Sequence, residues 1–316
     1  MPQLPNEHDN ASARCWGIFV PNRFFLIFFV NCVRIFNIEL REYLMADADK
    51  SIYGRKVFFV GANTTFESQV VERLRLMEYE VYAINDYRKA KPYLRKYADS
   101  ICFCIAESQL SLKGWHNFIK SFENENVFHP LDMGVILPPL PDEKKENFIS
   151  ELQLDAGVFT HNPDMETLFH EIVKAMDAKN AKGMRKYIRA NCLTEPQADL
   201  LWLKDNRMFK LKIIDISSVG IAAKLSTGQA NAVFINQIIE GVTLNLKSVQ
   251  VGVDIKISAI KDAGDFLLVV IMFTTSTLPE AINKIRGYIG ENLNETLRSS
   301  IRNSDLDRTD YEKLES

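Results

Sequence analysis

The sequence predicts two folded parts in series: a doubly wound parallel α/β sandwich, then an antiparallel β-barrel that ends in a helix. Three observations lead to this prediction. Short apolar runs alternate with helical periodicity between residues 55 and 182, as in parallel β-α units. Between residues 200 and 273 apolar and polar residues alternate with a period of two, as in half-buried antiparallel strands. An apolar stripe of helical period then covers residues 279–301.

The first part is predicted to contain five strands, each followed by a helix. The strands cover residues 57–60, 81–84, 101–105, 134–137 and 158–160. The helices include residues 87–97, 115–122 and 148–152. The first helix is predicted to bury a stripe formed by Phe66, Val70, Leu74 and Met77. The last helix has Asn162 as its expected N-cap and Pro163 at its first position.

The second part is predicted to be a closed barrel of six or seven strands, because closure leaves no open sheet edge. Its strands are expected at residues 201–203, 209–213, 221–225, 242–247, 251–258 and 266–273. Asp205-Asn206-Arg207 and residues 262–265 read as hairpin turns. The last strand is apolar on both faces, so we expect it to be covered on both sides. The helix from Pro279 should pack over the barrel mouth or against a partner.

The composition is that of an ordinary globular protein and excludes several classes. The chain has 316 residues, 47% hydrophobic and 25% charged, with a net charge of −3. Because this balance is not basic, neither DNA nor RNA is expected as a partner. The five cysteines have no zinc-site spacing and are expected to be small apolar residues in a reducing cytoplasm, with no metal and no cofactor.

Residues 1–50 fit neither part and form a predicted N-terminal extension. Their apolar run, residues 24–33, is too short to cross a membrane. We favour a disordered extension or a start codon assigned too early, with translation from Met45; a membrane-interacting anchor in residues 1–44 is the alternative. The predicted boundaries are therefore 51–178 for the α/β part, 179–303 for the barrel with its linker and helix, and 304–316 for a charged, disordered tail.

Two short motifs at the start of the second part indicate a binding site. Arg185 and Arg189 place two guanidinium groups within reach of one ligand, where each can pair with a phosphate or a guanine edge and stack on a purine. Asp215 and Ser217 alternate on a predicted strand, so their side chains share a face and can accept from guanine N1 and N2. Gly220 permits a turn or a close approach. Together these residues indicate an anionic ligand that contains guanine.

R-x-x-x-R followed about two dozen residues later by D-x-S-x-x-G resembles the signature of the PilZ domain, over roughly residues 184–301. PilZ domains are small β-barrels that bind the bacterial second messenger cyclic di-GMP. The resemblance implies that Arg185 and Arg189 grip phosphates and guanine faces, and that Gly220 shapes the turn beneath the ligand. It implies that Asp215 and Ser217 take the guanine edge. The expected protein is a cytoplasmic, non-enzymatic receptor whose ligand changes the domain arrangement and the binding of an unidentified protein partner.

The first part resembles the receiver domain of response regulators but lacks its phosphorylation chemistry. The acidic pair after the first strand is replaced by Gly61-Ala62-Asn63, and the phosphoacceptor position reads Ala106-Glu107. The Lys-Pro after the fifth strand is replaced by residues 160–163. These residues do not offer the oxygen ligands that Mg²⁺ requires. The resemblance implies a partner-binding or positioning module that cannot be phosphorylated. Glu107 is expected to be a solvated loop carboxylate, as most carboxylates are, with a lone ligand or a phosphate mimic as the alternative.

No catalytic arrangement is evident, so no enzymatic activity is predicted. The chain lacks G-x-G-x-x-G, a P-loop lysine and a G-x-S-x-G elbow. His116, His161 and His170 are expected to be satisfied by hydrogen bonds in the core or at the surface. Three alternatives remain: a PilZ scaffold that binds no ligand, a phosphorylation-driven response regulator with a PilZ output, and an enzyme that uses FMN on the α/β part.

Overall fold

The computed structural model describes residues 54–301 and 314, except residues 124, 129, 162, 163 and 248. The chain divides into two compact units, residues 1–44 and 45–316, and all the described residues belong to the second. The prediction for residues 1–50 therefore lies outside the described residues. Within residues 54–301, no helix combines the length and the apolar character needed to span a bilayer.

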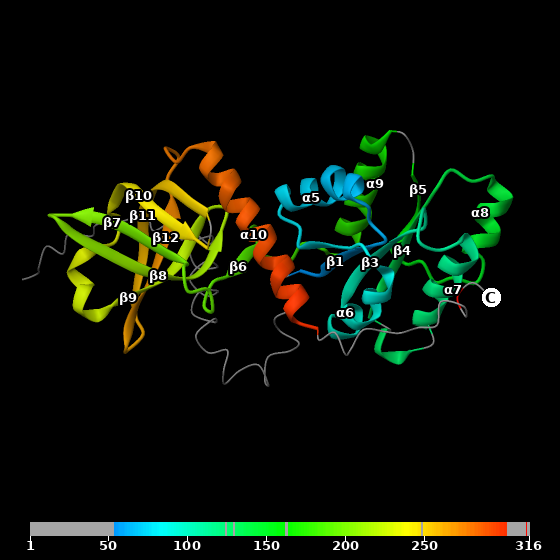
Figure 1. Ribbon diagram of the computed structural model, residues 1–316, viewed down its shortest axis with the longest axis horizontal. Helices are drawn as coiled ribbons and strands as arrows, with labels where there is room; N and C mark the ends of the chain where they lie inside the picture. Colours follow the sequence, from blue (N-terminus) through cyan, green and yellow to red (C-terminus); the bar gives the residue numbers. More distant parts are fainter. Residues whose placement is uncertain are drawn as a thin grey trace, which may run out of the picture. The chain divides into compact units, whose positions relative to one another are not determined.

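A five-stranded parallel sheet forms the α/β part, with the order β2-β1-β3-β4-β5 (Figure 1). Its strands are β1 (Lys56–Val60), β2 (Val81–Ile84), β3 (Ser100–Ile105), β4 (Asp132–Leu137) and β5 (Gly157–Thr160). β3 is buried at every residue, because apolar clusters cover both faces of the sheet. Its cysteines, Cys102 and Cys104, are free and buried, as predicted. The predicted doubly wound sandwich is confirmed.

The helices of this part lie on the two faces of the sheet. α6 (Ala90–Lys96) and α7 (Leu112–Glu123) contribute to one cluster, and α5 (Glu72–Leu76) and α9 (Met165–Ala178) to the other. α8 (Asp142–Ile149) begins and ends earlier than predicted. The N-cap of α9 is Asp164, whose side chain accepts from the Glu166 N–H. The prediction of Asn162 at this position is wrong, because the helix begins at Met165; Asn162 and Pro163 lie outside the described residues.

The first helix is interrupted by a π-helical turn. α4 (Thr64–Phe66) leads into the π segment Glu67–Val71 and then into α5. The wider turn rotates the residues that follow, so Val71 is buried beside Val70, whereas Met77 is 40% exposed. The predicted stripe is therefore wrong at Met77, since it assumed a regular period of 3.6 residues.

The second part is a ring of six antiparallel strands in the order β8-β7-β10-β11-β12-β9, closed because β9 pairs with β8. The strands are β7 (Asp199–Lys204), β8 (Arg207–Ser217), β9 (Gly220–Ser226), β10 (Ile238–Leu246), β11 (Val249–Asp262) and β12 (Phe266–Phe273). A short strand, β6 (Arg189–Asn191), is added to β8. The predicted barrel is confirmed. The turn at Asp205 and Asn206 has φ values of 50° and 59°, as a tight hairpin requires.

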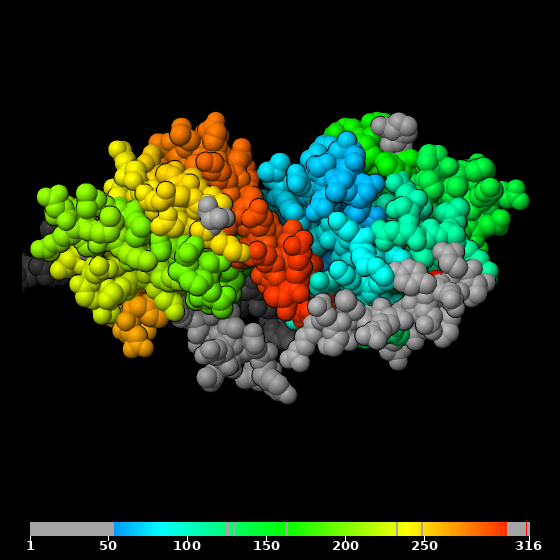
Figure 2. All heavy atoms as spheres, viewed as in Figure 1, coloured from blue at the N-terminus to red at the C-terminus, as the bar shows by residue number. Residues whose placement is uncertain are grey.

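α10 (Pro279–Ser299) belongs to two hydrophobic cores. Ile285 and Ile289 pack in the barrel core, as predicted for a helix over the barrel. Leu297 instead packs in the α/β core, and Figure 2 shows the end of α10, in red, against the cyan atoms of that part.

The predicted tail has one described residue, Leu314, which is buried and whose backbone carbonyl accepts from Asn117 Nδ2 at 2.7 Å. The expectation of disorder is therefore wrong at Leu314, because the α/β core provides an apolar surface for it.

Candidate functional site

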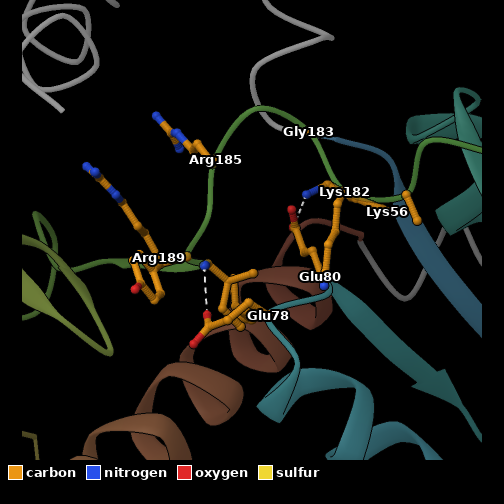
Figure 3. Close-up of a pocket in the computed structure, with 11 residues that line it drawn as sticks. Lys56, Glu78, Glu80, Lys182, Gly183, Arg185 and Arg189 are labelled. Atoms are coloured by element: carbon orange, nitrogen blue, oxygen red, sulfur yellow. Dashed lines mark hydrogen bonds and ion pairs between the residues drawn. The ribbon is translucent and has the colours of Figure 1, made fainter. Parts of the chain in front are cut away.

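Strand pairing brings the two sequence motifs into direct contact. β6 runs antiparallel to the end of β8, so that Arg189 lies opposite Ser217 and Asn191 lies opposite Asp215. Arg185 lies four residues before Arg189, in the irregular segment that leads into β6. Figure 3 shows the side chains of both arginines extending to the same side of this segment. The structure therefore unites two motifs whose proximity the sequence spacing alone does not establish.

Arg189 and Asp215 form a buried ion pair. Nη1 of Arg189 lies 3.4 Å from Oδ1 of Asp215. Burial raises the pKa of Asp215, and the positive charges of Arg189 and then Arg185 act in the opposite direction. The two arginines therefore offset part of the free-energy cost of burying this carboxylate. Asp215 is an electrostatic partner of both arginines of the motif.

Ser217 and Gly220 form the tight turn between β8 and β9. Ser217 Oγ donates to the Gly220 carbonyl at 3.1 Å and accepts from the Val219 N–H at 3.4 Å. A Cβ on Gly220 would lie 2.3 Å from the carbonyl oxygen of Ile271 in β12. The absence of a side chain at Gly220 thus lets β9 and β12 approach each other closely.

A pocket of about 210 Å³ lies beside the two arginines (Figure 3). Its lining residues come from the α/β part, the connecting segment, β6 and α10: Lys56, Glu78, Glu80, Ala181, Lys182, Gly183, Arg185, Tyr187, Ile188, Arg189 and Leu293. Of the five predicted site residues, Arg185 and Arg189 line the pocket. Asp215, Ser217 and Gly220 are not among its lining residues. Asp215 and Ser217 lie in β8, which pairs with the strand of Arg189, and Gly220 begins the next strand, β9.

The charged side chains of the pocket are mainly cationic. Four are basic and two are acidic. Lys56 is paired with Glu80, and Lys182 Nζ lies 4.0 Å from the ring centroid of Tyr79. An excess of positive charge together with the planar groups of Arg189 and Tyr187 suits an anion that carries a flat ring.

Glu78 is a residue of this site that the sequence did not indicate. It lies between α5 and β2 with a φ of 65°. Its Oε2 accepts from the backbone N–H of Ile188 at 3.0 Å, and its Oε1 accepts from Ser218 Oγ at 2.7 Å. Ile188 belongs to the arginine motif and Ser218 to the D-x-S-x-x-G motif. One carboxylate of the α/β part therefore holds both motifs.

At the carboxyl ends of β3 and β5, the side chain of Glu107 contacts His161 Nδ1. Glu107 is an exposed residue, as predicted, and its side chain also contacts His161, because parallel strands bring these loops together. His161 Nε2 also lies 3.0 Å from Met165 Sδ, and His116 Nδ1 lies 2.7 Å from the Phe148 carbonyl. These two histidines are satisfied, as predicted. Among the described residues, no group of His, Cys, Asp and Glu is arranged to hold a metal ion.

Comparison with known proteins gave matches among solved structures. No protein-family model matches the chain, and no curated protein gives a significant match. The PilZ domain with c-di-GMP of YcgR from Escherichia coli is 16% identical, with a TM-score of 0.33, over 37% of this chain and 96% of that chain. The K. pneumonia MrkH–c-di-GMP complex is 16% identical, with a TM-score of 0.30, over 37% and 53%.

A third similar structure is the Borreliella burgdorferi PlzA protein in complex with c-di-GMP. It is 17% identical, with a TM-score of 0.24, over 40% of this chain and 50% of that chain. The chain thus spans about half the length of MrkH and PlzA in these matches.

Proposed function

We propose that the protein is a non-enzymatic receptor for cyclic di-GMP and that its barrel is a PilZ domain. The observation that carries the proposal is the pairing of β6 with β8, which places Arg189 opposite Ser217 and beside Asp215. The two halves of the motif therefore form one structural unit at the edge of a cationic pocket. Cyclic di-GMP carries two phosphodiester charges and two guanine bases, which are the groups that such a site recognises.

The charge and size of the pocket support this ligand. Its basic side chains outnumber its acidic side chains, and this excess remains when the pairing of Arg189 with Asp215 is counted, which suits an anionic ligand. Guanidinium groups bind phosphate bidentately and stack on purines, so Arg185 and Arg189 would hold both kinds of group. A volume of about 210 Å³ is below the roughly 300–1,000 Å³ of sites that enclose a whole drug-sized ligand. The pocket would therefore receive one end of the dinucleotide.

The position of the pocket supports a role in signalling. Lys56 and Glu78 of the α/β part and Leu293 of α10 line it together with the arginine motif. A ligand bound there would contact both the α/β part and the barrel part of the chain. Binding would therefore be coupled to the arrangement of these two parts. The α/β part would then present this change to a protein partner in the cytoplasm.

Two arginine variants test the site in the full chain. Each of Arg185→Ala and Arg189→Ala should weaken cyclic di-GMP binding by about tenfold or more, because each removes a charge-assisted contact. Arg207→Ala is the matched control, since Arg207 is exposed at the beginning of β8 and should leave the affinity unchanged. Titration calorimetry measures the affinity, and circular dichroism verifies folding. A folded Arg189→Ala protein with undiminished affinity would refute the proposed site.

A further inference from the structure

The carboxylates that line the pocket come from the α/β part rather than from the D-x-S-x-x-G motif. Asp215 is 7% exposed and paired with Arg189, and the hydroxyl of Ser217 is used in the turn to Gly220. Glu78 and Glu80 line the pocket instead. A base that enters the pocket therefore meets hydrogen-bond acceptors supplied by the α/β part.

Of these two carboxylates, Glu78 is the one that can accept a further hydrogen bond on each of its two oxygens. Oε1 of Glu80 accepts from Lys56 and from the Tyr82 hydroxyl, and the ammonium of Lys56 offsets its charge. Each oxygen of Glu78 accepts one bond from a neutral donor. A carboxylate offers about four acceptor positions, so each oxygen can accept once more. Two adjacent acceptors match the N1–H and N2–H donors of guanine.

The structure fixes the orientation of Glu78. Its own N–H donates to the Arg75 carbonyl at 2.9 Å, and the next residue, Tyr79, is buried. The donors on its carboxylate, Ile188 N–H and Ser218 Oγ, belong to the two motif segments. Acceptors that are held in position before the ligand arrives give up little conformational freedom on binding.

We propose that Glu78 is a specificity-determining residue that recognises the N1–H and N2–H edge of a guanine base held beside Arg185 and Arg189. This inference rests on the proposed receptor function and assigns base recognition to the α/β part. Adenine presents an acceptor at N1, which would face the carboxylate without a proton between them. The site would therefore reject cyclic di-AMP through an unfavourable contact as well as select cyclic di-GMP.

The test compares two ligands on the full chain. Glu78→Gln should weaken cyclic di-GMP binding by about tenfold or more, because hydrogen bonds to a charged group are lost. The preference for cyclic di-GMP over cyclic di-AMP should fall as well, since an amide can donate to adenine N1. Glu72→Gln is the charge-matched control: Glu72 is exposed on α5, outside the pocket, and both affinities should be unchanged. An unchanged preference in Glu78→Gln, or a loss of preference in Glu80→Gln instead, would overturn the inference.

A second variant keeps the inference testable if Glu78→Gln does not fold. Ser218→Ala removes one of the two hydrogen bonds that orient the carboxylate and should lower the base preference several-fold. A folded Ser218→Ala protein with an unchanged preference would then count against the inference.

Different results would refute the receptor function and the role of Glu78. An unmodified chain that binds no cyclic di-GMP refutes the receptor function and with it the role of Glu78, whereas selective binding that Glu78→Gln leaves intact refutes only the latter.

Discussion

At Asp215, burial and the charges of two arginines act in opposite directions on one carboxyl group. Its pKa is raised because burial outweighs the attraction of Arg189 and Arg185. A raised pKa means that the folded protein holds this proton more tightly than the unfolded chain does. The contribution of Asp215 to stability is therefore fully present below the ordinary carboxyl pKa of 3.8, and it is lost as the pH rises through the raised pKa.

Replacement of Asp215 by Asn removes this titration and makes the effect measurable. The free energy of unfolding of the wild type, relative to that of Asp215→Asn, should decrease as the pH rises from about 3.8 through the raised pKa and should then become constant. Urea unfolding at a series of pH values measures it. A relative stability that instead increases with pH would show that the pKa of Asp215 is lowered by its partners.

The sequence indicated the residues of the two motifs, but it did not indicate Glu78. Arg189 and Asp215 carry chemistry that can be read from residue type and spacing. Glu78 contacts residues 110 and 140 positions away, and its role depends on a turn that brings the α/β part against both motifs. Periodicity and local motifs are visible in a single sequence, whereas the contacts of Glu78 with Ile188 and Ser218 depend on how whole elements pack.

Among the elements, β9 and β12 give the sharpest test of packing. Gly220→Ala would place a Cβ 2.3 Å from the Ile271 carbonyl oxygen, so the two strands would have to separate. We expect a loss of about 2 kcal/mol or more in the free energy of unfolding. Gly252→Ala is the control, because a Cβ there meets no atom within 4 Å. Chemical denaturation should leave this control within about 0.5 kcal/mol of the wild type, and equal stability of the two variants would contradict the packing.

The elements that the sequence predicted well are those with a strong period. The five parallel strands and the barrel strands follow directly from apolar runs and alternation. The π-helical turn at Glu67–Val71 was missed because it changes the period within one helix. α10 was predicted as a helix with one apolar stripe, but the sequence does not indicate which hydrophobic core such a stripe packs in. In the structure, Ile285 of that stripe packs in the barrel core and Leu297 packs in the α/β core.

At the scale of the whole molecule, several elements converge on one pocket. The segment before β6 supplies the arginines, the turn between α5 and β2 supplies Glu78, and α10 supplies Leu293. Arg75 Nη2 also donates to Asn294 Oδ1 at 3.0 Å, which links α5 to α10 near this site. In the proposed receptor, the α/β part would therefore contribute to ligand binding, in addition to any role in contacting a partner.

Titration of cyclic di-GMP into the full chain, with GTP and cyclic AMP as controls, tests the receptor function most directly. We expect saturable binding of cyclic di-GMP and much weaker binding of both controls, since GTP is not a cyclic dinucleotide and cyclic AMP has one phosphodiester and an adenine base. Absence of binding by a folded chain would contradict the receptor function and would leave a barrel that acts as a scaffold.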